Sequence, residues 1–85
     1  MPSHTFHDCC NAIIRAADGK PQAANIQFAA SYSRQGLRMP DAASNAECAD
    51  ETRVQISYIL VNLSGWRGEE ARAVRRSLKA IGGIK

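Results

Sequence analysis

Four side chains near the N-terminus belong to the residue types that bind metals or act as nucleophiles: His4, His7, Cys9 and Cys10. His4, His7 and Cys10 are spaced three apart, so a helix would bring them toward one another, and Cys48 would be a further ligand. Structural zinc sites, however, usually present ligand pairs separated by a short loop, and no matching second pair follows. We therefore expect no bound metal and no cofactor, with small core cysteines and histidines at the surface.

Nucleophilic catalysis is the second chemistry that these residues suggest, because Cys9 or Cys10 has a histidine nearby in the sequence. A catalytic thiol also needs a cleft, an oxyanion site and a third orienting group, and the sequence indicates none of these. Glu69 and Glu70 are adjacent and are explained by a helix start, so they are not read as an acid–base pair. The glycines form neither GxGxxG nor GxxxxGK[ST]. The chain is therefore predicted not to be an enzyme.

The main candidate for a binding function is the C-terminal segment, which contains the only tryptophan and most of the basic residues. Tryptophan and arginine are enriched at interface hot spots, and a row of cations suits an acidic partner. The candidate partner-binding residues are Trp66, Arg67, Arg72, Arg75, Arg76 and Lys79. Two simpler interpretations stay open: the tryptophan as a core anchor, and the cations as a solvated helix surface.

A predicted helix positions these cations. Gly68 is expected to be its N-cap, and Gly82 with Gly83 its end. The apolar residues Ala71, Val74, Leu78 and Ile81 recur at helical spacing, so burial of this stripe would turn the basic residues outward. We therefore expect all four basic residues of this helix to be exposed.

Three further helices are expected upstream. Thr5 and Asp8 resemble a capping box for a first helix that closes at Gly19, and Pro21 and Gly36 mark the start and end of a second. Ser44 and Glu47 would form another capping box. The run 54–63 alternates like a strand but also repeats like a helix, and we choose a helix because no strand partner is nearby. Since this third helix is hydrophobic nearly all round, we expect it to be central and the most buried.

Length and composition indicate one all-α domain over residues 1–85, with 45% hydrophobic and 22% charged residues and a net charge of +3. No apolar run approaches the ~20 residues of a membrane span. The N-terminus lacks the basic start and apolar stretch of a signal peptide. Three cysteines, an odd number, do not resemble a disulfide framework. We expect a cytoplasmic protein, monomeric or a small homo-oligomer, that does not bind membranes.

Residues 53–76 resemble a C-terminal segment of small uncharacterised proteins from bacterial phages and mobile elements. Such small proteins include anti-CRISPR proteins, which commonly cover a surface of a host complex. The similarity to anti-CRISPR proteins is one of size and character and not of motif. It implies a phage or mobile-element inhibitor of a host defence complex, and it carries no assigned site residues.

The sequence thus predicts a non-enzymatic protein that acts by stoichiometric protein–protein contact through its basic C-terminal helix. The alternative is a helix-turn-helix-like regulator that binds DNA or RNA with the same cations. Glu69 and Glu70 oppose it, because they would meet phosphate at the start of a recognition helix. A third class, a self-associating bundle, would need an exposed apolar face.

Overall fold

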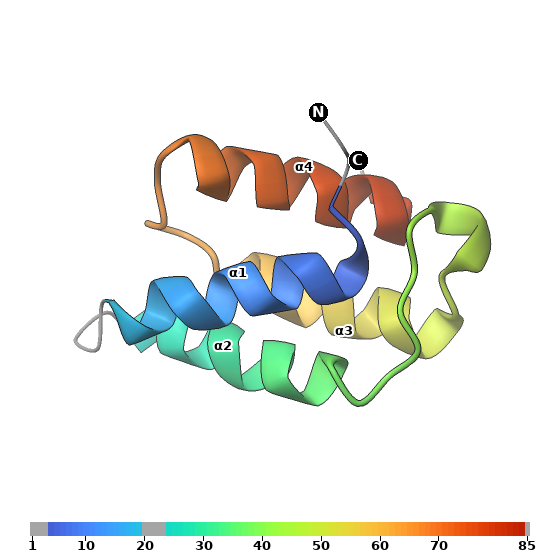
Figure 1. The fold of residues 1–85 in the computed structure, drawn as a ribbon, viewed down its shortest axis with the longest axis horizontal. Helices are drawn as coiled ribbons and strands as arrows, with labels where there is room; N and C mark the ends of the chain where they lie inside the picture. Colours follow the sequence, from blue (N-terminus) through green and yellow to red (C-terminus); the bar gives the residue numbers. More distant parts are fainter. Residues whose placement is uncertain (1–3, 20–23, 85) are drawn as a thin grey trace.

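The computed structural model describes residues 4–19 and 24–84 and shows a bundle of α-helices (Figure 1). The elements in chain order are α1 (Phe6–Asp18), α2 (Ala24–Gly36), the short 3-10 helix η1 (Asn45–Glu47), α3 (Asp50–Val61) and α4 (Glu69–Gly82). Successive α-helices run in alternating directions along a body that measures 36 × 26 × 19 Å. No strand occurs in the described residues, and the predicted all-α fold is confirmed.

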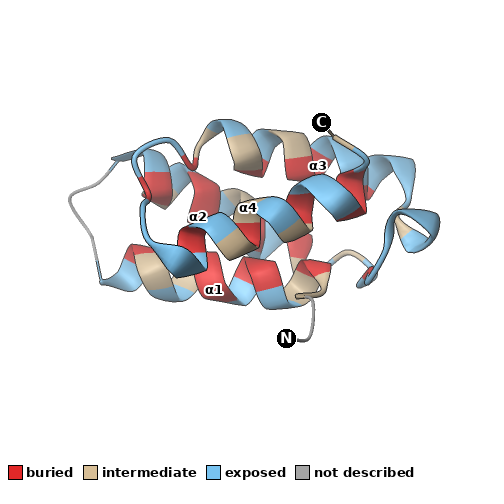
Figure 2. Cartoon of the chain, turned by 90° about the horizontal axis from the view of Figure 1, so that it is seen from above, coloured by how far each residue is buried: buried red, intermediate tan, exposed pale blue. Residues whose placement is uncertain are grey.

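Helix α1 buries more residues than any other helix, and it packs against both α2 and α4 (Figure 2). Its start is the predicted capping box: the Thr5 hydroxyl accepts from the Asp8 amide at 3.2 Å, and the Asp8 carboxylate accepts from the Thr5 amide at 3.0 Å. Two adjacent pairs of buried residues, Cys9 with Cys10 and Ala12 with Ile13, lie one turn apart, so α1 is buried on the sides that face α2 and α4. The buried residues of α1 are Phe6, Cys9, Cys10, Ala12, Ile13 and Ala17.

The contact between α1 and α2 is close because Gly36 has no side chain. A Cβ at Gly36 would lie 2.7 Å from Cζ of Phe6 and 3.1 Å from Sγ of Cys10. The predicted end of the second helix at Gly36 is confirmed. The predicted start at Pro21 lies outside the described residues.

Helix α3 confirms the choice of helix over strand for residues 54–61, but it is not the most buried helix. Three of its large apolar residues are exposed: Val54 at 51%, Tyr58 at 48% and Val61 at 72%. The reason is that α3, like each of the other α-helices, contacts only two α-helices, here α2 and α4, so its remaining side faces solvent. The rings of Tyr58 and Tyr32 stack at 5.4 Å between centroids across the α2–α3 boundary.

The connection from α2 to α3 is fastened to the start of α1 and to the end of α4, which lie at the same end of the bundle (Figure 1). The amide of Phe6 donates to the carbonyl of Ala42 at 2.8 Å, and Nδ2 of Asn45 donates to the carbonyl of Ile81 at 2.9 Å. The predicted capping box at Ser44 is wrong: its side chain makes no capping bond, and Glu47 instead accepts from the Ala43 amide at 2.7 Å. This long connection therefore has defined contacts despite its loop-like composition.

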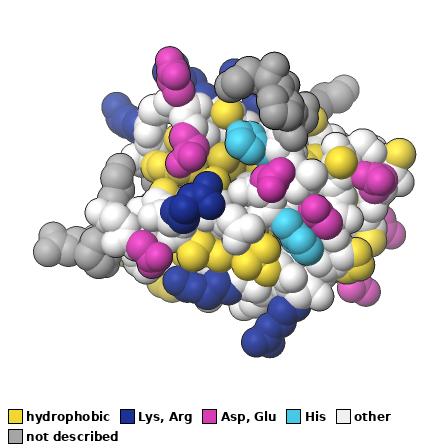
Figure 3. Space-filling view, viewed as in Figure 1, with side chains coloured by type: hydrophobic (Ala, Val, Ile, Leu, Met, Phe, Trp, Pro, Cys, Tyr) yellow, Lys and Arg dark blue, Asp and Glu magenta, His cyan; other side chains and the backbone are white. Residues whose placement is uncertain are grey.

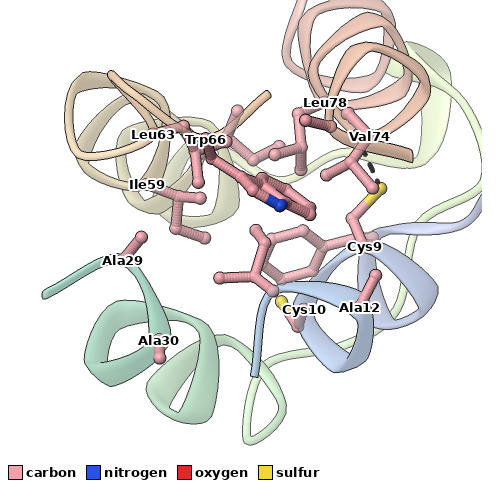
Figure 4. Close-up of a cluster of buried hydrophobic side chains, with 14 of the residues drawn as sticks. Cys9, Cys10, Ala12, Ala29, Ala30, Ile59, Leu63, Trp66, Val74 and Leu78 are labelled. Carbon is pink, nitrogen blue, oxygen red and sulfur yellow. Dashed lines mark hydrogen bonds between the residues drawn. The ribbon is translucent and has the colours of Figure 1, made fainter. Parts of the chain in front are cut away.

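One core cluster joins all four α-helices (Figure 4). Ile59 and Leu63 from the α3 side meet Val74 and Leu78 from α4, and the indole of Trp66 lies in the middle of the cluster. No α-helix in the described residues is long and apolar enough to cross a bilayer.

Candidate anion-binding site at the start of α4

The connection from α3 to α4, residues 62–68, is shaped by two glycines. Gly65 has φ of +89° and Gly68 has φ of +111°, a backbone conformation that other residues rarely adopt. Gly68 is the N-cap of α4, as predicted, and it has no side chain to bond the first amides of the helix. The connection therefore turns sharply on both sides of Trp66 and Arg67.

Trp66 is only 7% exposed, and its ring points into the core beside Leu63 (Figure 4). Its amide donates to the carbonyl of Leu63 at 3.1 Å. Trp66 thus acts as the core anchor that fixes the connection, which was the simpler of the two interpretations of this residue.

Arg75 differs from the expectation that every cation of α4 faces outward. Its side chain is half-buried, and Nη2 donates to the carbonyl of Leu63 at 2.7 Å and also to the carbonyl of Trp66. The guanidinium therefore donates to two backbone carbonyls of the connection, which lie outside the hydrogen bonding of α3 and α4. Arg75 holds the connection against α4. Its positive charge therefore lies beside Trp66.

The predicted residues around this connection share one surface hollow of about 480 Å³. Arg67 and Arg72 are exposed at the hollow, whereas Arg75 is fixed beside Trp66. Its lining is Gly65, Trp66, Arg67, Gly68, Arg72 and Arg75. We call this surface the arginine hollow. Of the residues that the structure describes, three arginines and no acidic residue line it, so it suits an oxyanion that accepts several charge-assisted hydrogen bonds.

The two remaining predicted cations lie elsewhere. Arg76 is exposed and lines a different hollow with His4, and Lys79 is exposed on the outer side of α4 and lines neither hollow. Glu69 and Glu70 are exposed in the first turn of α4, as predicted, and neither lines the arginine hollow. The predicted basic residues thus do not share one site: three line the arginine hollow, Arg76 lines another hollow, and Lys79 lines neither.

The cysteines are free thiols in environments that disfavour the thiolate. Burial, with a smaller contribution from nearby acidic groups, raises the pKa of Cys9 from 9.0 to about 12. Burial also raises the pKa of Cys10 to about 12 and that of Cys48 to a lesser extent. The Cys9 thiol donates to the carbonyl of Val74 at 3.9 Å (Figure 4). None of the three is arranged as an activated nucleophile.

The histidines have separate surroundings. His7 Nε2 donates to the Met39 carbonyl at 2.7 Å, and the His7 amide donates to Asp41 at 2.8 Å. Burial raises the pKa of Asp41, but hydrogen bonds from His7, Thr5 and Ala42 outweigh it and hold that pKa below its usual value. No group of three metal-binding side chains converges in residues 4–19 and 24–84.

Comparison with protein-family models, characterised proteins and solved structures gives no match to this chain. The geometry of the arginine hollow is therefore the basis for the function proposed below. Arg75 is the functional residue whose role the sequence reasoning missed. The spacing of the sequence could have indicated its partial burial. Arg75 lies four residues after Ala71 and three before Leu78, at the edge of the buried stripe.

Proposed function

We propose that this chain is a non-enzymatic binding protein that contacts a carboxylate-bearing surface of a protein partner through the arginine hollow. The observation that carries the proposal is the convergence of Arg67, Arg72 and Arg75 on one hollow whose lining, within the described part of the chain, contains no acidic side chain. Arg75 and Trp66 are fixed by the fold, so the hollow is formed before a partner arrives. Preorganisation of this kind lowers the entropic cost of binding.

Binding is favoured over catalysis by the state of the nucleophiles. Cys9 and Cys10 are fully buried, and their raised pKa values keep both thiols protonated at neutral pH. The arginine hollow itself contains guanidinium groups and a buried indole, which are poor general bases near neutral pH. A stoichiometric contact is therefore the simplest use of this surface.

A protein partner is favoured over nucleic acid by the charges around the hollow. Glu69 and Glu70 are exposed at the start of α4, where a recognition helix would approach phosphates. Helices α3 and α4 lie alongside each other, unlike the crossed helices of a helix-turn-helix (Figure 1). On the face drawn in Figure 3, basic and acidic side chains are interspersed. Such a pattern suits a local contact better than a long polyanion.

The biological setting of the proposal rests on the resemblance of residues 53–76 alone. On that ground we propose an inhibitor from a phage or mobile element that covers part of a host defence complex in the cytoplasm. Three free thiols support a reducing compartment.

Capture from a bacterial lysate on the immobilised chain tests the proposal, with and without nuclease. The test variant is R67A/R72A. The control is R34A/R38A, which removes the same charge from two exposed arginines beside a separate hollow at the end of α2. We expect a nuclease-resistant protein that the wild type and R34A/R38A retain and R67A/R72A loses. A nuclease-sensitive catch, or equal capture by both double variants, would contradict it.

A further inference from the structure

A second hollow, of about 350 Å³, lies where the second half of α4 meets the α2–α3 connection and His4, which precedes α1 by two residues. The connection is held there because Asn45 donates to the carbonyl of Ile81 at 2.9 Å, at the last turn of α4. The hollow is thus formed by three segments that are distant in sequence. Its volume lies at the lower end of the range for small-molecule sites.

The walls of this hollow combine a cation with neutral hydrogen-bonding groups. Arg76 provides a guanidinium, His4 an imidazole, and Ser44 and Ser77 provide hydroxyl groups. The Ser44 hydroxyl is not used to cap η1. Among the described residues no carboxylate lines the hollow, so a bound anion would meet no opposing negative charge from them.

The rest of the lining is apolar. Ala43, Ala80 and Ile81 contribute aliphatic side chains, and Ile81 is buried while Ala43 and Ala80 are exposed. A ligand therefore needs a short hydrocarbon body beside its anionic head. An inorganic anion would leave this part of the hollow unused.

We propose that this hollow binds a small organic carboxylate, with its head at Arg76, His4 and the serine hydroxyls and its hydrocarbon part on Ala80 and Ile81. One guanidinium can hold one carboxylate through two parallel hydrogen bonds. This site is separate from the arginine hollow, and it goes beyond the function proposed above. Arg76 is accordingly assigned to the small ligand and not to the protein partner.

The test is an NMR titration of the full chain with hexanoate, recording the backbone amides. The controls are hexanamide, which keeps the hydrocarbon and loses the charge, and inorganic phosphate, which keeps only an anion. We expect saturable shifts at Ser44, Ser77, Ala80 and Ile81 with hexanoate, and affinities at least tenfold weaker for both controls. Equal binding of hexanamide, stronger binding of phosphate or no saturation with hexanoate would overturn the proposal.

Two variants separate charge recognition from the shape of the hollow. R76A removes the guanidinium from an exposed position, and A80L fills the hollow from an exposed helical position without removing charge. Each should weaken hexanoate at least tenfold, whereas R76K should recover part of the affinity. R67A/R72A should bind hexanoate like the wild type, which distinguishes failure of this site from failure of the arginine hollow. Unchanged binding in both R76A and A80L would also overturn the proposal.

Discussion

Nη2 of Arg75 donates a hydrogen bond to the backbone carbonyl of Leu63 across 2.7 Å, and so joins the middle of α4 to the end of the α3 segment. The same atom also bonds the carbonyl of Trp66. A cation that sequence reasoning places in solvent is thus part of the packing that shapes the arginine hollow. Its removal should affect both stability and binding, unlike removal of its exposed neighbours.

The variant R75A should lower the free energy of unfolding by about 1.5–3 kcal/mol, because two partly buried hydrogen bonds from a charged donor are lost. Urea denaturation followed by Trp66 fluorescence measures this change. The matched control is R72A, whose side chain is exposed and should change stability by less than about 0.5 kcal/mol. Equal stability of R75A and R72A would show that the Arg75 hydrogen bonds contribute nothing to the fold.

Gly19 at the end of α1 and Gly36 at the end of α2 should respond differently to alanine. G36A should destabilise by about 1–3 kcal/mol, because the new Cβ would lie 2.7 Å from the buried Phe6 ring. G19A should be neutral or stabilising by up to about 1 kcal/mol, since Gly19 has φ of −80° and its nearest neighbour would be 3.6 Å away. Thermal denaturation of both variants compares them, and a G36A protein as stable as G19A contradicts the close helix contact.

The thiols should differ in reactivity toward a disulfide reagent in the native state. Only Cys48 is partly exposed, so one thiol should react in the folded chain, and Cys9 and Cys10 should react only on unfolding. The variant C48S should then show no native reaction. A second fast thiol in C48S would be inconsistent with a buried pair in α1.

Because Cys9 and Cys10 are buried, we expect the protein to lose stability at alkaline pH. The pKa of each buried thiol is raised to about 12, so the unfolded chain releases these protons first, near the ordinary value of 9.0. Their contribution to stability is therefore complete below pH 9.0 and falls as the pH rises toward 12, by up to about 1.4 kcal/mol per pH unit for each thiol. Urea midpoints measured across this range test the direction, and a rising midpoint is the contrary result.

Substitutions on the two sides of α3 should separate its buried and exposed residues. I59A should cost about 2–5 kcal/mol, because Ile59 is fully buried in the core cluster. V61K should change stability by less than about 0.5 kcal/mol, because Val61 is 72% exposed. Chemical denaturation of the two variants tests whether α3 is half-exposed, and similar large losses would restore the central position expected for it.

Helix boundaries were predictable because their signals are local. The reciprocal bonds of Thr5 and Asp8, and the glycine at position 68, follow from residues within one turn of each helix start. The all-α class followed from the same patterns together with the lack of strand partners.

Exposure of individual side chains was less predictable, because it depends on neighbours distant in sequence. Val61 is exposed because no helix covers the outer side of α3, and Arg75 is held because the α3–α4 connection brings two carbonyls to it. The arginine hollow was predictable only in part. Its residues were named from composition, but the placement of Arg76 in a second hollow depends on the packing of the α2–α3 connection against α4.

The most direct measurement of the central claim uses Trp66, the only tryptophan, as a reporter at the arginine hollow. Its fluorescence is followed during titration with a glutamate-rich peptide and with an oligonucleotide of equal charge, for the wild type, R67A/R72A and R34A/R38A. We predict saturable binding of the peptide to the wild type and to R34A/R38A, about tenfold weaker binding to R67A/R72A, and weaker binding of the oligonucleotide throughout. Tighter, steeply salt-dependent binding of the oligonucleotide, or equal loss of peptide binding in both double variants, would contradict the proposed function.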